Sequence, residues 1–70
     1  MPTLVRAVFP GTFDPIPLGH EDMLRRACAL FGEVIVAVAM AHHKKTLFTL
    51  DERLSITRQA LADMPKVRVE

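Results

Sequence analysis

The amino-acid sequence predicts an α/β fold in which the strands of a parallel sheet alternate with helices. Short apolar runs of strand length occur at 4–9 and 33–39 and begin again at 67, and the two segments between them have the apolar period of a helix. This order, with short connections, is typical of right-handed β-α-β-α-β crossovers. Because the chain has 70 residues, we expect residues 1–70 to be one small globular unit, or only part of a single domain.

The first strand and the first helix are separated by a stretch rich in glycine and proline. The run LVRAVF, residues 4–9, is apolar and β-branched, and we expect it to stop at the turn formed by Pro10 and Gly11. Apolar residues then recur at helical spacing from about residue 18 to residue 31. Gly32 follows, and we expect it to supply a left-handed cap for this helix.

The second strand is expected at EVIVAVA, residues 33–39. Its apolar run is unbroken, which is typical of a parallel strand, whereas a half-exposed strand would alternate apolar and polar residues. The two predicted helices, each following a strand in the same direction, would cover only one face of the sheet. We therefore expect the other face to be bare in a chain of this length and the fold to be truncated.

The second helix carries a clear start signal. Thr49 is followed three residues later by Glu52, which predicts a capping box and a helix beginning at Leu50. Asp51, Glu52 and Arg53 are interpreted as capping and helix-surface charges. The predicted inward stripe is Leu50, Leu54, Thr57, Leu61 and Met64, and the helix should end at Met64-Pro65, before a third strand from Val67.

Composition limits the classes of function. Nine basic and eight acidic side chains give a formal net charge of +1, which argues against binding of nucleic acid or of an anionic membrane. The longest apolar run, 34–41, is too short to span a bilayer, so we expect a cytoplasmic protein. A single cysteine, Cys28, fits a reducing compartment, and its apolar surroundings indicate a core thiol.

Chemistry-bearing residues follow the first two strands. Gly11 and Thr12 follow the first strand, and the loop 42–45 follows the second, so both should lie at the same edge of a parallel sheet, where ligands collect. Gly11 would allow close backbone approach, and His20 lies near the start of a helix whose free amides favour anions. An ordinary strand-to-helix turn, with Asp14 as a turn former, is the alternative reading of the same residues.

The stretch GTFDPIPLGH resembles the first signature of the nucleotidyltransferase superfamily. Together with GHEDMLRRA, VIVAVA, KKTLFTLDER and the final VRV, it makes the whole chain similar to the amino-terminal half of the bacterial phosphopantetheine adenylyltransferase family. The resemblance implies a Rossmann-like domain that transfers the adenylyl group of ATP to 4'-phosphopantetheine, giving dephospho-coenzyme A and pyrophosphate. It also implies Mg²⁺ held mainly by ATP, and a homohexamer.

The resemblance assigns roles to four residues of this chain. His20 would contact the ATP phosphates and stabilise charge in the transition state, and the backbone of Thr12 and Phe13 would hold ATP. Thr12 would also contact the phosphate of phosphopantetheine, and Lys44 would bind that acceptor phosphate. Because the attacking group is already an anion, the reaction needs alignment and charge neutralisation rather than a protein nucleophile.

Neighbouring residues are weighed as alternatives. Lys45 is expected to be a solvated charge rather than a second ligand. His42 and His43 are adjacent and point in divergent directions, and no further ligands have suitable spacing, so no metal site formed by the protein is predicted. Pro17 occupies the place where the superfamily carries threonine or histidine, and we expect it to weaken the phosphate contact while the helix tolerates it.

Two other functions stay open at this point. The chain could belong to a related nucleotidyltransferase that uses nicotinamide mononucleotide or a polyol phosphate as acceptor. It could also be a noncatalytic nucleotide-binding fragment, because members of the resembled family are roughly twice as long and their second half completes the pocket. We expect the 70-residue chain alone to be a fragment, poorly soluble or disordered, and inactive.

Overall fold

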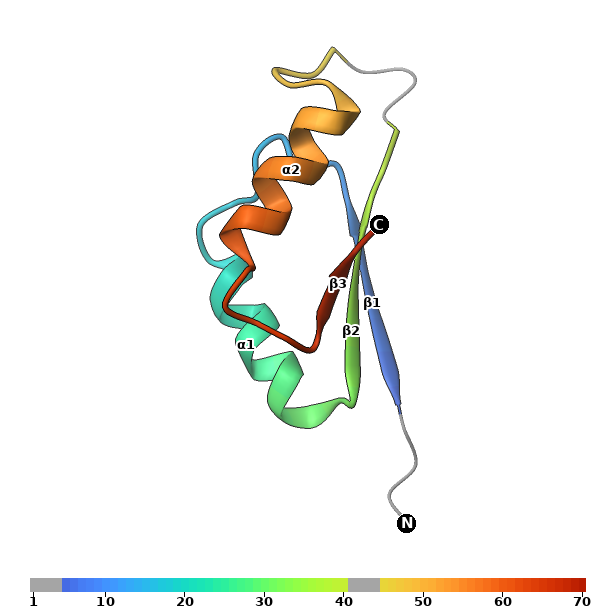
Figure 1. Ribbon diagram of the computed structural model, residues 1–70, viewed down its shortest axis with the longest axis vertical. Helices are drawn as coiled ribbons and strands as arrows, with labels where there is room; N and C mark the ends of the chain where they lie inside the picture. Colours follow the sequence, from blue (N-terminus) through green and yellow to red (C-terminus); the bar gives the residue numbers. More distant parts are fainter. Residues whose placement is uncertain (1–4, 41–44) are drawn as a thin grey trace.

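The computed structural model describes residues 5–40 and 45–70, and strands and helices alternate along them. The elements are β1 (Arg6–Gly11), α1 (His20–Leu30), β2 (Glu33–Val38), α2 (Leu50–Ala60) and β3 (Val67–Val69). The three strands form one parallel sheet in the order β1-β2-β3 (Figure 1). This confirms the predicted Rossmann-like α/β arrangement.

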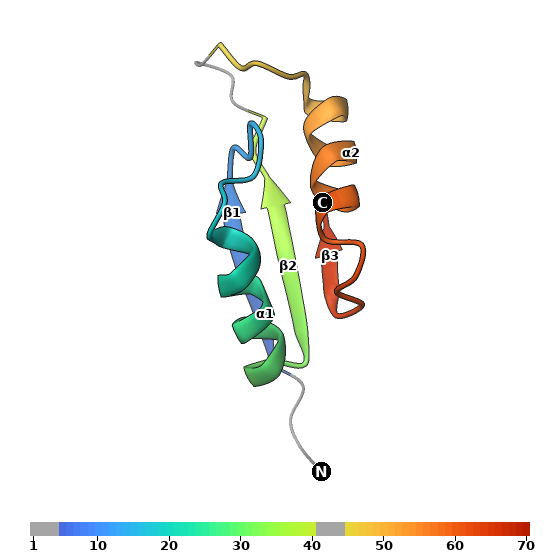
Figure 2. The ribbon, with the colours of Figure 1, turned by 90° about the vertical axis from the view of Figure 1, so that its left-hand side faces the viewer.

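Both helices lie on the same face of the sheet. Figure 1 shows α1 and α2 on one side of the three strands, and the turned view in Figure 2 shows both in front of them. Since the strands follow one another across the sheet and each crossover helix covers the same face, the two crossovers have the same hand. The layer of helices on the opposite face, typical of a doubly wound sheet, is absent from the described residues.

The hydrophobic core lies between β2 and the two helices. Val34 and Val36 of β2 are completely buried, and Cys28 packs against the core as a partly buried side chain, as predicted. The buried apolar set is Phe13, Leu24, Ala27, Val34, Val36, Leu61 and Met64. In this set, α1 contributes Leu24 and Ala27 and the turn after α2 contributes Leu61 and Met64, and all pack against the central strand β2.

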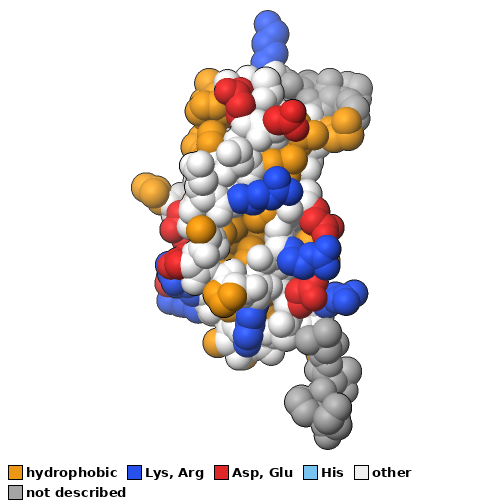
Figure 3. All heavy atoms as spheres, in the orientation of Figure 1, with side chains coloured by type: hydrophobic (Ala, Val, Ile, Leu, Met, Phe, Trp, Pro, Cys, Tyr) orange, Lys and Arg blue, Asp and Glu red, His pale blue; other side chains and the backbone are white. Residues whose placement is uncertain are grey.

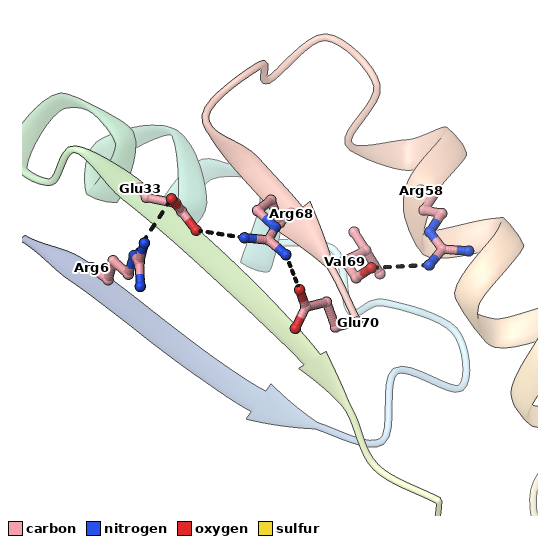
Figure 4. A network of polar contacts seen from close by, with 6 residues as sticks. All are labelled: Arg6, Glu33, Arg58, Arg68, Val69 and Glu70. Carbon is pink, nitrogen blue, oxygen red and sulfur yellow. Dashed lines mark hydrogen bonds and ion pairs between the residues drawn. The ribbon is translucent and has the colours of Figure 1, made fainter.

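The opposite face of the sheet is open to solvent in the described part of the chain. Val8 of β1 pairs with Ile35 of β2, and Val8 is 57% exposed. Near them, Glu33 forms an ion pair with Arg6 at 3.5 Å and accepts a hydrogen bond from Arg68 at 3.3 Å, and Arg68 also contacts Glu70 (Figure 4). Each of these exposed ion pairs contributes little to the stability of the fold. The apolar side chain of Val8 beside them remains exposed to solvent.

The charge distribution agrees with the composition. In the view of Figure 3, acidic and basic side chains are interspersed over the surface and exposed hydrophobic side chains lie among them. None of the helices in the described residues is both long and apolar enough to cross a membrane.

The observed ends of β1 and α1 differ from the predicted ones, each for a physical reason. β1 continues through Pro10 to Gly11, because β1 pairs only with β2 in the described sheet and an edge strand tolerates a missing amide. α1 ends at Leu30 without a left-handed glycine: Phe31 is extended, with φ −116°, and Gly32 does not have a positive φ. The amide of Gly32 instead donates to the carbonyl of Val5, which joins the helix end to the start of β1.

Helix α2 begins as predicted and ends early. Thr49 accepts a hydrogen bond from the amide of Glu52, and the amide of Thr49 donates to the Glu52 carboxylate, which completes the capping box. Regular helix stops at Ala60, and a turn continues to Met64. The inward stripe is confirmed for Thr57, Leu61 and Met64, which are buried, whereas Leu50 and Leu54 are only partly buried.

Candidate functional site

The carboxyl ends of β1 and β2 lie side by side. The amide of Ala39, just after β2, donates to the carbonyl of Gly11 at the end of β1, at 2.8 Å. The turn after β1 therefore starts next to Ala39, the first residue after β2, whereas its predicted meeting with the loop 42–45 stays a prediction. His42, His43 and Lys44 lie outside the described residues, and Lys45 is exposed.

Phe13 joins this turn to the start of α1. It has a positive φ of 51°, which is uncommon for a residue with a β-carbon, and its side chain is buried to 6% exposure. Its ring packs edge-on against the imidazole of His20, with ring centroids 6.1 Å apart and planes at 87°. The structure thus brings His20 next to the turn that contains Thr12. The resemblance assigns both of these residues to ATP.

Gly11 has a different role from the predicted one. A β-carbon at this position would lie 3.1 Å from two atoms of the Phe13 ring, which is closer than ordinary packing allows. The space beside Gly11 is filled by Phe13 and is not left open for the backbone to approach a ligand. The glycine therefore acts on the site by letting Phe13 take its buried position.

The amino terminus of α1 supplies one component of an anion site. Gly19 is the N-cap and makes no side-chain capping bond, so the macrodipole end is not covered by a capping side chain. The acidic residues Glu21 and Asp22 in the first turn oppose a bound anion, however. Pro17 lies before the N-cap rather than in the first helical turn as predicted, and its carbonyl accepts a hydrogen bond from the His20 amide at 3.1 Å.

Asp14 connects the turn after β1 to the residues that precede α2, a contact that the sequence did not predict. Its carboxylate accepts hydrogen bonds from the amides of Leu47 and Phe48, at 2.6 Å and 2.9 Å. Asp14 therefore does more than form a turn, because it anchors the residues that lead into α2 to the turn after β1. The spacing in the sequence gives no sign of this long-range contact.

Arg53 is the largest departure from the sequence-based interpretation. It was expected on the helix surface, yet it is 2% exposed. Its guanidinium donates to the carbonyls of Thr12 at 2.9 Å, Ala39 at 2.6 Å and Phe48 at 3.2 Å, with a longer contact of 3.5 Å to Met40. The available signal was its position: three residues after Leu50 and four before Thr57, it belongs to the buried stripe.

No protein ligand set for a metal is found at this rim or elsewhere in residues 5–40 and 45–70, where no three His, Cys, Asp or Glu side chains group suitably. The resolved pKa shifts also lie away from it. Arg25 donates to Asp63 at 2.5 Å, and this hydrogen bond lowers the pKa of Asp63 below its usual value and raises that of Arg25. That pair lines an open hollow of about 320 Å³ beside Cys28.

Comparison with known proteins gives a consistent result. Residues 8–70 match the family model described as cytidylyltransferase-like. Over 66 residues, 94% of the chain, the sequence is 73% identical to a phosphopantetheine adenylyltransferase of Acidovorax sp. (strain JS42), of which it covers 40%. Proteins of the same name from Thiobacillus denitrificans and Nitrosospira multiformis are 57% and 56% identical over 96% and 91% of the chain.

The chain spans about two fifths of the length of these relatives, with 40%, 42% and 39% of the three proteins covered. This share is somewhat smaller than the half that the sequence resemblance implied. The matched part of the chain includes the turn with Thr12, the start of α1 with His20, and the segment with Lys44.

Proposed function

The chain belongs to the cytidylyltransferase-like family, and we propose that the protein containing it transfers the adenylyl group of ATP to 4'-phosphopantetheine. The products would be dephospho-coenzyme A and pyrophosphate. The observation that carries the proposal is the rim at the ends of β1 and β2, where His20 packs on Phe13 beside Thr12. The 73% identity to a phosphopantetheine adenylyltransferase supports the choice of acceptor.

The proposed roles follow from the charges in the reaction. The phosphate of 4'-phosphopantetheine attacks the α-phosphorus of ATP, a new P–O bond forms, and the bond to pyrophosphate breaks. No proton has to be removed from the attacking phosphate oxygen, so the protein must align two anions and stabilise the developing charge. His20 would contact the ATP phosphates, Thr12 and the backbone of Phe13 would hold ATP, and Thr12 and Lys44 would hold the acceptor phosphate.

Mg²⁺ is proposed to be bound mainly by ATP rather than by a set of protein ligands. It would supply charge neutralisation between phosphate oxygens. The structure supports this assignment in one respect: the carboxylate of Asp14, which belongs to the turn after β1, is already engaged by the amides of Leu47 and Phe48. Cytoplasmic location and a homohexameric assembly are proposed on the resemblance alone, and light scattering of the full-length protein tests the second.

The test of the function is a panel of substrates given to a full-length protein that contains these residues. Pyrophosphate release should be fast with ATP and 4'-phosphopantetheine, and slow when nicotinamide mononucleotide replaces the acceptor. A cytidylyl reaction, with CTP and glycerol phosphate, should also be slow. Preference for either alternative pair would assign a related nucleotidyltransferase, and binding of ATP without turnover of any pair would assign the noncatalytic reading.

A further inference from the structure

We propose that Arg53 is a positioning residue of this rim: its guanidinium sets the orientation of the turn after β1 and holds both ends of the segment that contains Lys44. The inference deepens the proposed function and rests on it for its kinetic test. Arg53 touches neither substrate in this account, because its donors are directed at the protein's own backbone.

The burial of Arg53 needs an explanation. A fully buried charge is costly unless it is hydrogen-bonded, and buried arginines are usually paired with a carboxylate. Within the described residues, the acceptors of Arg53 are backbone carbonyls and not carboxylates. The guanidinium therefore satisfies its donors with backbone carbonyls and makes no direct ion pair within the described residues, although the Asp14 carboxylate binds the amide of Phe48 beside it. Its role is thus to hold backbone rather than to complete an ion pair.

The first consequence concerns the turn. The carbonyl of Thr12 and the amide of Phe13 belong to the same planar peptide group, so fixing one fixes the direction of the other. Arg53 donates to this carbonyl at 2.9 Å, which turns the Phe13 amide away from the guanidinium. A hydrogen bond from a cation also polarises the peptide and makes its N–H a stronger donor. This amide is one of the groups proposed to hold ATP.

The second consequence concerns the segment between β2 and α2. Ala39 and Met40 come just before residues 41–47, and Phe48 comes just after them, and Arg53 donates to all three carbonyls. Asp14 completes the attachment by accepting the amide of Phe48, so both sides of this residue are held. One planar guanidinium thus fixes the span that the segment must bridge, which a flexible ammonium cannot reproduce.

The experiment compares Arg53→Lys with Arg58→Lys in a full-length protein that contains these residues. Both variants keep a positive charge on α2, but Arg58 is exposed and donates only to the carbonyl of Val69 among the described residues. We expect Arg53→Lys to lower kcat about tenfold or more and to raise the KM for ATP several-fold at a temperature where it is folded. Arg58→Lys should leave both constants unchanged.

A purely structural role gives a different result. It would lower the melting temperature and the folded fraction of Arg53→Lys while the KM values stayed at those of the parent, and this outcome would overturn the proposal. If Arg53→Lys does not fold, Arg53→Gln, which keeps two donors, is measured in the same way and is judged by the same criterion.

Hydrogen exchange separates the inference from the proposed function. In Arg53→Lys, peptides covering 11–14 and 45–49 should exchange faster than in the parent and in Arg58→Lys, without any substrate present. If the parent shows no pyrophosphate release, the proposed function fails, and faster exchange would still support positioning by Arg53. Unchanged exchange in both peptides would overturn the positioning role whatever the enzyme's activity.

Discussion

The imidazole of His20 and the buried ring of Phe13 form a T-shaped pair, with centroids 6.1 Å apart and planes at 87°. This contact links the proposed catalytic group to a turn residue with a positive φ, and the Phe13 ring in turn lies against Gly11. The position of His20 at the rim therefore depends on packing behind it. Edge-to-face pairs of this kind contribute about 0.5 to 1.5 kcal/mol beyond burial, which is enough to bias a side-chain position.

Gly11→Ala is expected to impair turnover through Phe13. The added methyl would lie 3.1 Å from two ring atoms, so the ring must shift and the contact with His20 must change. We expect a loss of about 1 to 3 kcal/mol in stability and a reduced kcat. The measurement is denaturant unfolding together with pyrophosphate release in the full-length protein. Gly19→Ala is the steric control for stability, because nothing lies within 4 Å of its added carbon.

Thr49→Ala tests the start of the helix that carries Arg53. The change removes the side-chain oxygen that accepts the Glu52 amide at 3.2 Å. Loss of such a cap costs about 1 kcal/mol. Denaturant unfolding of the full-length protein measures it, with Ser55→Ala on the exposed part of the same helix as the control. Equal stability of the two variants would show that the capping box contributes nothing.

Asp63→Asn tests the pair between α1 and the turn after α2. Because the folded pKa of Asp63 is lowered by Arg25, the pair's contribution is present above the usual carboxyl pKa of 3.8 and is lost as pH falls through the lowered value. We expect a small loss of stability at neutral pH, since both side chains are exposed. The difference in melting temperature between Asp63→Asn and the parent should be present at neutral pH. It should vanish in acid, below the lowered pKa of Asp63. A difference that persisted in acid would assign the effect to another cause.

The sequence predicted the parts of this fold that depend on local pattern. The capping box at Thr49 and Glu52 and the parallel strand predicted at 33–39 are encoded by neighbouring residues. The structure confirms the capping box and places the strand at Glu33–Val38. Arg53 is buried although it is charged, because its position on α2 places it on the inward side of the helix. Asp14 is separated along the sequence from Leu47 by 33 positions and from Phe48 by 34. No local sequence pattern encodes a contact over such a separation.

The candidate site was predictable to a similar extent. Parallel topology predicts that the strand ends lie side by side, and the hydrogen bond between Ala39 and Gly11 shows this. The approach of the loop 42–45 to the turn after β1 stays a prediction, because 42–44 lie outside the described residues. The contact of Phe13 with His20 could not be foreseen, because it depends on a positive φ at a bulky residue. The roles of His20, Thr12 and Lys44 toward substrates stay predictions.

The isolated 70-residue chain is expected to fold poorly. Val8 and its partner Ile35 lie on the sheet face that no described helix covers, and Val8 is 57% exposed. A chain of this size buries only about 60% of its unfolded surface. Thermal unfolding followed by circular dichroism should show no sharp transition. The control joins these residues to the remaining part of the Acidovorax relative, which should melt cooperatively. A cooperative transition of the short chain would contradict this prediction.

The central claim is that His20 and Lys44 serve two different phosphates at one rim. Steady-state pyrophosphate release by the full-length protein tests it most directly, with His20→Ala, Lys44→Ala and the matched control Lys45→Ala. His20→Ala should lower kcat about a hundredfold or more, whereas Lys44→Ala should chiefly raise the KM for 4'-phosphopantetheine. Lys45→Ala should leave both constants unchanged. A kcat that survives the loss of His20, or a KM for 4'-phosphopantetheine that does not respond to the loss of Lys44, would contradict the account.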